Sequence, residues 1–366
     1  MRRVIIFLAA AAVMVVSAAL FTGCGRGTDT DTLRIFNWAV YTPQSVIDAF
    51  EREYGVTVIY SEFSSNEEML ARLRTGGLFG RFRPPGRDFD VVFPSGDYVA
   101  IMIRLGMLER LDHSLIPNLA NIDPVVVAKA TYDPALQYSV PYFFGAAGIA
   151  VNTYRVPDFE RCISIFSRTD LNEGAIRRMT MLDDPRQVIG DALNYLGFSV
   201  NTRNPQEIAA ARDHIMTHWW PNLVRFDSST IGTAFLNEEF WVVQTWAEDV
   251  LSRIALAGDE RLMNNTVFFF PPGASSYTDN MVILRGSPNV ELAHKFINFI
   301  HRPDIHAMFV DEFGLPSTVN IPARRYTQAT PWFTVEDMAI TGEIQDDVGP
   351  AMEYFTDAWF TIRVGN

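Results

Sequence analysis

The chain has 366 residues, which is more than one ordinary hydrophobic core can organise, so two lobes are expected. Hydrophobic residues make up 48% of the chain and charged residues 20%, a balance that is typical of globular proteins and excludes a largely disordered chain. The formal net charge of −13 at pH 7 argues against general binding of nucleic acid, which needs a basic surface for the phosphates, and is compatible with cationic partners.

The first 23 residues are interpreted as a signal peptide. Arg2 and Arg3 form a basic start, and an apolar run follows from Val4 to Phe21. A run of this length at the extreme N-terminus is typical of a secretory signal, whereas an uncleaved membrane anchor would need flanking anchor residues as well.

Cys24 ends this run in the sequence FTGC, which resembles the processing site of bacterial lipoproteins. Such sites usually carry Leu three residues before the cysteine, where Phe21 stands here. We expect lipidation at Cys24, followed by a small, polar tether that extends to residue 32 (tether 24–32). Ordinary cleavage nearby, leaving a free thiol, is the alternative. Cys162 is the other cysteine, so no intramolecular disulfide is expected in the lipidated protein.

From Leu33 onward, segments with strand-like patterns alternate with segments of helical spacing. Strands are expected at 33–38, 56–63 and 89–95, with helices at 43–55, from residue 65 or 66, and up to residue 106. Further along, helices are expected at 205–216, 235–256 and 289–300, and strands at 266–273 and 280–288. Strands that alternate with helices favour a parallel sheet with crossover connections.

Two other segments have distinctive compositions. Residues 139–152, SVPYFFGAAGIAVN, are apolar and rich in small residues, which predicts an extended crossing between the lobes. Residues 76–88 are rich in Gly, Pro and Arg, which predicts a long exposed loop.

The familiar signatures of catalysis and metal binding are weak or missing in the sequence. His214 and His218 have a spacing that can bind a metal, but no Glu follows His214, so a helix face is the favoured interpretation. The GAAG segment at 145–148 is not a dinucleotide fingerprint, and no nucleophile elbow occurs. Nothing near Cys162 would activate its thiol, so a buried apolar role is favoured. The sequence therefore predicts no enzyme, no metal site and no cofactor.

Aromatic residues stand beside carboxylates at several junctions between the expected elements. The pairs are Trp38 with Tyr41, Asp97 with Tyr98, Trp246 with Asp249, and Tyr277 with Asp279, and Asp183-Asp184-Pro185 adds two carboxylates at a turn. Such a set suits an organic amine, because carboxylates neutralise the ammonium group while ring faces attract it and cover its methylene stem. Each pair alone is more commonly part of a core or a turn cap, so it is their repetition that favours an amine site.

Five segments carry a more specific signal: FNWAVYTP at 36–43, VVFPSGDYV at 91–99, VPYFFGAAGIAVN at 140–152, LDDPRQV at 182–188 and GEIQDDVG at 342–349. In this order they resemble the spermidine/putrescine-binding proteins of bacterial polyamine ABC importers. The resemblance implies a type II periplasmic binding protein fold, in which two α/β lobes hold the ligand in a cleft. Residues 33–146 with 281–314 are expected to form lobe 1, and residues 147–280 with 315–366 lobe 2.

The resemblance also implies a set of ligand contacts. They are the aromatic residues Trp38, Tyr41, Trp246 and Tyr277, the carboxylates Asp184, Asp249 and Asp279, and the polar residues Ser95 and Gln345. Gln187 stands where spermidine-binding members carry Glu, and Asp97 stands where they carry an aromatic residue; both remain candidate contacts. Leu315 replaces a tyrosine, and the loop at 76–88 is longer than usual, so the choice between polyamines stays open.

The implied function is that of a lipid-anchored periplasmic receptor. It would trap putrescine or spermidine by closure of the lobes and deliver it to an ABC transporter permease. The sequence leaves open the same fold with another amine, an amino-sugar or a metal ion as ligand, and a surface lipoprotein without a role in transport.

Replacing Cys24 with alanine is expected to abolish lipid attachment, because the thiol is the group that would carry the lipid. Wild type should partition into the detergent phase of a two-phase extraction, and Cys24→Ala into the aqueous phase. Cys162→Ala is the matched control and should behave as wild type. Equal partition of wild type and Cys24→Ala into detergent would contradict the interpretation.

Overall fold

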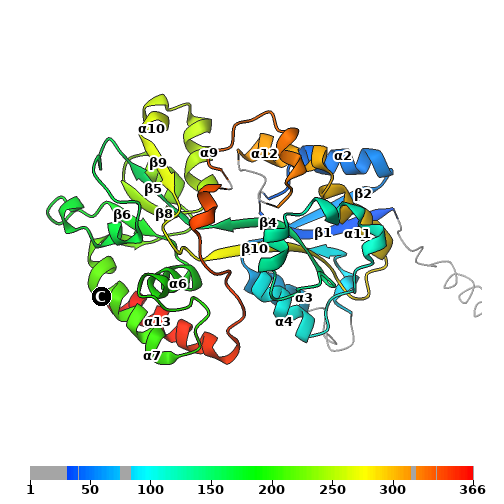
Figure 1. The fold of residues 1–366 in the computed structure, drawn as a ribbon, viewed down its shortest axis with the longest axis horizontal. Coiled ribbons are helices and arrows are strands. Elements are labelled where there is room, and N and C mark those ends of the chain that lie inside the picture. Colours follow the sequence, from blue (N-terminus) through cyan, green and yellow to red (C-terminus); the bar gives the residue numbers. More distant parts are fainter. Residues whose placement is uncertain (1–30, 40, 75–83, 315–318, 335, 366) are drawn as a thin grey trace, which may run out of the picture.

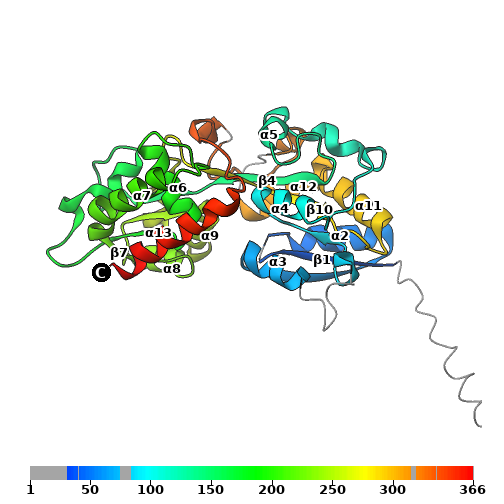
Figure 2. The ribbon, with the colours of Figure 1, turned by 90° about the horizontal axis from the view of Figure 1, so that it is seen from below.

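The computed structural model describes residues 31–366 except 40, 75–83, 315–318, 335 and 366. Two lobes lie side by side, and each contains a five-stranded sheet with helices packed on its faces (Figures 1 and 2). The signal peptide, Cys24 and most of the tether lie outside the described residues, as do Leu315 and most of the loop at 76–88.

The first sheet has the strand order β2-β1-β3-β10-β4. Its strands are β1 (Thr32–Trp38), β2 (Thr57–Phe63), β3 (Val91–Val92), β4 (Ser139–Ala146) and β10 (Ser276–Ile283). β1 pairs in parallel with β2 and β3, whereas β10 runs antiparallel to both β3 and β4. The helices of this lobe are α2 (Gln44–Tyr54), α3 (Asn66–Arg74), α4 (Gly96–Arg104), α5 (Pro124–Lys129), α11 (Val290–Ile300) and α12 (Pro303–Phe313).

Helix α2 illustrates why the expected alternation of strands and helices holds in this lobe. Val46, Ile47 and Phe50 recur on one face of the helix and are buried in the lobe 1 core. The helix ends at Gly55, whose φ of 66° is a left-handed conformation that glycine adopts without steric cost. Thr42, which precedes the helix, does not cap it: its hydroxyl accepts a hydrogen bond from Asn37 Nδ2.

The second sheet has the order β7-β6-β8-β5-β9. Its strands are β5 (Gly148–Asn152), β6 (Met179–Met181), β7 (Leu223–Phe226), β8 (Val242–Thr245) and β9 (Thr266–Phe269). β6 is parallel to β7 and β8, and β5 is antiparallel to β8 and β9. The helices are α6 (Pro185–Tyr195), α7 (Pro205–His214), α8 (Ile231–Leu236), α9 (Ala247–Ala257), α10 (Glu260–Asn264) and α13 (Met352–Val364).

The single helix expected over residues 235–256 is wrong. The structure divides this stretch into the end of α8, the buried strand β8 and most of α9. Glu238 has a φ of 57°, which no helix interior tolerates, and the β-branched pair Val242 and Val243 follows it. A short, fully buried strand has no polar alternation, so spacing alone could not distinguish it from a helix.

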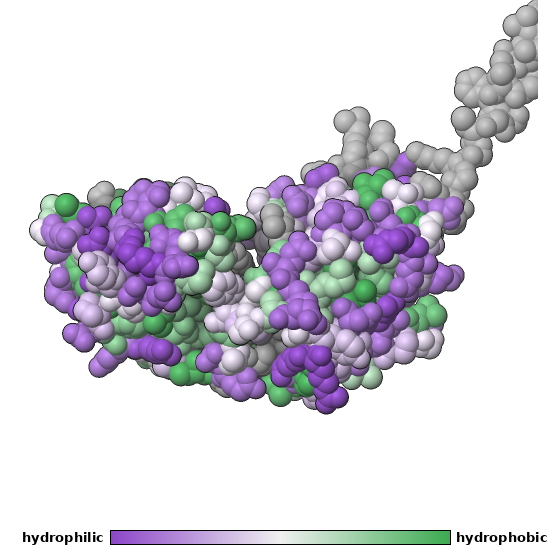
Figure 3. All heavy atoms as spheres, turned by 90° about the horizontal axis from the view of Figure 1, so that it is seen from above, coloured by the Kyte–Doolittle hydropathy of each residue, from purple (hydrophilic) through white to green (hydrophobic). Residues whose placement is uncertain are grey.

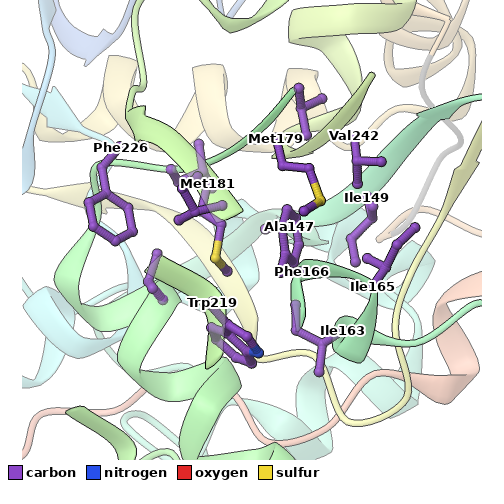
Figure 4. Packing of buried hydrophobic residues seen from close by; sticks show 14 of the residues in the cluster. Ala147, Ile149, Ile163, Ile165, Phe166, Met179, Met181, Trp219, Phe226 and Val242 are labelled. Atoms are coloured by element: carbon purple, nitrogen blue, oxygen red, sulfur yellow. The ribbon is translucent and has the colours of Figure 1, made fainter. Parts of the chain in front are cut away.

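The core of lobe 2 fills the space between its sheet and helices. Figure 4 shows Met179 and Met181 of β6 on the same side of the strand region as Trp219 and Phe166, all of which are buried. Continuous burial of both faces of β6 and β8 explains why these strands read as apolar runs.

Three chain segments cross between the lobes. The first joins β4 to β5 through Ala147, and the second joins β9 to β10, which pairs with β4 from its first residue onward. Residues 276–280, assigned to lobe 2 by the expected boundaries, are thus part of a strand of the first sheet. The third crossing follows α12: Val319 still packs against Val126 of lobe 1, whereas α13 packs against α6 and α7.

The register of the strands turns the carboxyl ends of the parallel strands of both sheets toward the crossings. Asp279, near the start of β10, faces Ser95 just after β3, and Gly148, which opens β5, pairs with Thr245 at the end of β8. Helices α4 and α9 begin directly after these strand ends. Figure 3 shows the surface indented between the two lobes. Ligands of open α/β sheets bind at such strand ends.

Candidate ligand-binding site

Asp279 is a buried carboxylate at the centre of the site. A bulge between Asp279 and Asn280 interrupts the pairing of β10 with β4, which redirects the side chains there. Tyr41 donates a hydrogen bond from Oη to one carboxylate oxygen at 2.8 Å, and Ser95 donates from Oγ to the other at 2.6 Å. Burial raises the pKa of Asp279 to about 6, and the hydroxyl donors Tyr41 and Ser95 are both neutral. The carboxylate is therefore oriented, but its charge is not balanced by these partners.

Ser95 is itself held in place by an asparagine of α3. Asn66 donates from Nδ2 to Ser95 Oγ at 3.0 Å, and its Oδ1 accepts the Ser95 backbone N–H at 3.2 Å. These two bonds fix the loop between β3 and α4, so the hydroxyl of Ser95 can only direct its proton toward Asp279.

Trp246 and Tyr277 form an aromatic wall beside this carboxylate. Their ring centroids are 5.1 Å apart with an interplanar angle of 85°, an edge-to-face contact. Trp246 stands at the N-terminus of α9 in lobe 2, whereas Tyr277 is two residues before Asp279 in β10. Tyr277 packs across Gly145 of β4: a Cβ at position 145 would lie 2.4 Å from the Tyr277 hydroxyl oxygen. Both rings are partly exposed.

Asp97 and Asp184 bring further negative charge to the cleft from opposite lobes. Loss of water around the Asp97 carboxyl raises its pKa to about 7, and the charge of Asp279 acts in the same direction. Asp184 accepts the backbone N–H of Gln187 as the cap of α6, and burial also raises its pKa. Glu67 of α3 repels both carboxylates and thereby adds to both shifts.

Arg186 lies among these carboxylates, and the sequence did not indicate a site role for it. The side chain is 8% exposed, and Nη2 donates to Asn201 Oδ1 and to the Asp346 carbonyl. Its charge lowers the pKa of both Asp97 and Asp184 against the effect of burial. The sequence signal for Arg186 was its position directly after the acidic turn Asp183-Asp184-Pro185. Arg186 thus offsets part of the negative charge at this end of the cleft.

Gln187 and Gln345, two further expected contacts, are in contact with each other. Gln345 Nε2 lies 3.3 Å from Gln187 Oε1 and 3.1 Å from Ser275 Oγ. Gln187 Nε2 in turn donates to Asp191, a buried carboxylate one helical turn further along α6. Asp191 was not predicted; a carboxylate within the apolar stretch VIGDAL was the signal.

Trp38, Asp249 and Tyr98 have local contacts of their own. Trp38 packs its ring against Phe63 in lobe 1, with centroids 4.6 Å apart. Asp249 accepts a long hydrogen bond from Thr245 at 3.5 Å; burial raises its pKa, and the charge acting on it is that of Arg253. Tyr98 donates to Glu67 instead of covering the cleft carboxylates.

The two histidines with metal-binding spacing pack as an aromatic pair. The rings of His214 and His218 are 4.7 Å apart. Across the described part of the chain, no group of three or more His, Cys, Asp or Glu side chains is arranged to hold a metal ion. Within the same residues, none of the helices combines the length and apolar character needed to cross a membrane.

Two α/β lobes whose strand ends converge on a cleft lined by carboxylates and aromatic rings define a solute-binding protein. The chain belongs to the family of bacterial extracellular solute-binding proteins, whose model matches residues 45–337. This membership confirms the two-lobed fold and the family resemblance inferred from the sequence.

Several characterised relatives are similar over most of their length. The chain is 31% identical over 356 residues to the spermidine/putrescine-binding periplasmic protein of Salmonella typhimurium, covering 95% of this chain and 96% of that protein. It is 27% identical over 313 residues to the putrescine-binding periplasmic protein PotF of Escherichia coli, covering 83% and 81%. The crystal structure of the Tp0655 (TpPotD) lipoprotein of Treponema pallidum matches with a TM-score of 0.83 and 42% identity, covering 91% and 99%.

Gly145→Ala is expected to disturb the aromatic wall, because the new methyl group would overlap the Tyr277 hydroxyl and force the ring to move. Such overpacking costs about 1–3 kcal/mol of unfolding free energy, measurable by urea denaturation, and should alter the near-ultraviolet circular dichroism. Gly190→Ala is the matched control: its Cβ would meet no atom closer than 3.6 Å, so the helix should be unchanged or slightly more stable. Equal stability and spectra for Gly145→Ala and wild type would contradict the packing argument.

Proposed function

We propose that this protein is a receptor for putrescine and spermidine that holds the ligand in the cleft between its lobes. The observation that carries the proposal is Asp279, a buried carboxylate oriented by two neutral donors beside an aromatic wall. An ammonium group entering there would balance the charge, while Trp246 and Tyr277 would cover the methylene chain. The names of the relatives, which bind spermidine and putrescine, support the same ligand class.

The second end of the ligand would lie toward Asp97 and Asp184. Because Arg186 already offsets part of their charge, this end would satisfy one ammonium rather than two. Asp249 and Trp38 would complete the walls of the cleft, as the family resemblance implies. The site would therefore accept putrescine as well as spermidine.

The biological setting completes the proposal. A ligand held by carboxylates from both lobes would favour the arrangement in which the lobes lie close together, so it would stabilise the closed form. The closed receptor would then deliver the polyamine to the permease of an ABC importer on the extracytoplasmic side, without catalysis. A lipid on Cys24 would keep it at the membrane; the Treponema pallidum neighbour is described as a lipoprotein, which supports this arrangement.

Asp279→Asn is the sharpest test, because it keeps the size and one acceptor oxygen of the side chain while removing the charge. Loss of one partner from a buried charge pair costs about 2–5 kcal/mol, or roughly 30- to several-thousand-fold in affinity. Isothermal titration calorimetry should be run with putrescine, spermidine, spermine, basic amino acids and ferric ion.

Asp90→Asn provides the control for Asp279→Asn. Asp90 is equally buried in lobe 1 but precedes β3, at the end of the strand away from the cleft, so this variant should bind as wild type. An Asp279→Asn protein with native circular dichroism and affinities within threefold of wild type for both polyamines would exclude Asp279 from the site. If wild type bound ferric ion or a basic amino acid more tightly than polyamines, that solute would replace polyamines as the proposed ligand.

The affinity for polyamines is expected to fall as the pH is lowered. Burial raises the pKa of the free Asp279 to about 6 and that of Asp97 to about 7, and a bound ammonium would lower both values. The contribution of each carboxylate to binding is thus fully present above its pKa in the free protein. It is lost as the pH falls below that value, by up to about tenfold in affinity per pH unit for each carboxyl. The ligand amines stay protonated throughout this range.

This dependence can be measured by calorimetry with putrescine at pH 5.5, 6.5, 7.5 and 8.5. Parallel titrations in buffers of different ionisation enthalpy would count the protons released on binding. Asp279→Asn should show a shallower profile than wild type. An affinity that stays constant from pH 8.5 to 5.5 would argue that these carboxyls do not meet the ligand.

A further inference from the structure

Asp191 is a buried carboxylate whose hydrogen-bond partners orient its charge without balancing it. It is 3% exposed, and its hydrogen-bond donors are all neutral: Gln187 Nε2 at 3.0 Å, Gln244 Nε2 at 2.5 Å, and Ser275, whose backbone N–H lies at 3.1 Å. Among the described residues, no arginine or lysine forms an ion pair with it, and the main causes of its pKa shift are burial and hydrogen bonds from neutral groups. Leaving a charge unpaired in a protein interior is costly.

The network around Asp191 fixes the direction of the Gln187 amide. The backbone N–H of Leu182 donates to Gln244 Oε1, so the Nε2 group of Gln244 must face Asp191. Ionised Asp191 can only accept, so Gln187 also turns its Nε2 group toward it. As a result, Gln187 Oε1 points away from Asp191 and toward Gln345.

This direction matters because the buried Gln187 lies in the first turn of α6, three residues after Asp184, which caps the helix. An amide that presents its oxygen attracts an ammonium group, whereas an amide that presents its NH₂ group repels it. An ammonium group could take the place of Gln345 Nε2 as the donor to Gln187 Oε1. Asp191 then lies behind this oxygen, in a region of low dielectric where its charge is poorly screened.

We propose that Asp191 is a positioning and specificity-determining residue for the amine ligand, which it serves through Gln187 without touching the ligand. This inference rests on the proposed polyamine-binding function. Asp191 holds the Gln187 oxygen toward the cleft and supplies, one helical turn behind it, the negative charge that a neutral glutamine lacks. The ammonium group that arrives with the ligand provides the cation that the buried carboxylate lacks.

Burial is consistent with this role, because it raises the pKa of Asp191 to about 6. The carboxylate is thus ionised at neutral pH but easily protonated when no ligand is near. A purely structural role is the competing explanation, since Asp191 also bonds Ser275 in the crossing that leads to β10. The two explanations differ in what restores function after the charge is removed.

Asp191→Asn should weaken the binding of putrescine and spermidine by at least tenfold in calorimetric titrations at pH 7.5. The new Nδ2 group would donate to Gln187, so the glutamine amide would reverse and turn its NH₂ group to the cleft. The double variant Gln187→Glu/Asp191→Asn moves the charge one turn along α6 and should restore affinities to within threefold of wild type. A merely structural Asp191 would not be rescued in this way.

Two controls separate stability from binding. Asp133→Asn removes another buried carboxylate with neutral donors, at the end of β4 away from the crossing, and should lower stability without changing affinity. Gln244→Met removes a donor from Asp191 while keeping the charge, so the pH at which affinity is half lost should rise. This variant provides a measurement even if Asp191→Asn fails to fold.

Three outcomes would overturn the inference. These are a folded Asp191→Asn protein that binds within threefold of wild type, a double variant that stays as weak as Asp191→Asn, and an unchanged pH profile for Gln244→Met. If wild type binds polyamines in the same titrations, these outcomes leave the proposed function intact. If wild type binds neither putrescine nor spermidine, the proposed function fails, and the role of Asp191 fails with it.

Discussion

The cleft is organised around the cost of keeping carboxylates out of water without enough cations to balance them. Burial raises the pKa values of Asp97, Asp279 and Asp191, and the hydroxyl and amide donors around the last two orient the charge without neutralising it. Such an arrangement is poor for stability on its own. A cation that entered the cleft would offset this cost, so the unfavourable burial of charge would add to its binding free energy.

The topology explains how so many polar groups reach one place. In each sheet, the parallel strands end at the side where the chain crosses to the other lobe, and the helices start there. Strand ends expose side chains that are free of the sheet, and helix starts supply backbone N–H groups that donate to carboxylates such as Asp184. Rigid elements on both lobes therefore carry the site.

The sequence predicted the parts of this structure that depend on local patterns. The alternation of β1, α2 and β2 follows from periodic apolar residues and a glycine stop. β8 was missed because a strand buried on both faces loses its alternation. Arg186 and Asp191 were missed because their roles arise from partners far along the chain: Ser275 lies 84 residues beyond Asp191. Only the folded chain brings them together.

The three crossings also have a mechanical consequence. β4 and β10 are hydrogen-bonded neighbours at the point where they leave the first sheet, and the segment after α12 provides a third strut between the lobes. Three connecting segments resist shear and twist more than they resist bending. The lobes should therefore rotate relative to each other about a single hinge axis. A pair of fluorescent labels placed on almost any two rigid positions, one per lobe, would then report the same coordinate, which makes this scaffold suitable for conversion into an optical sensor.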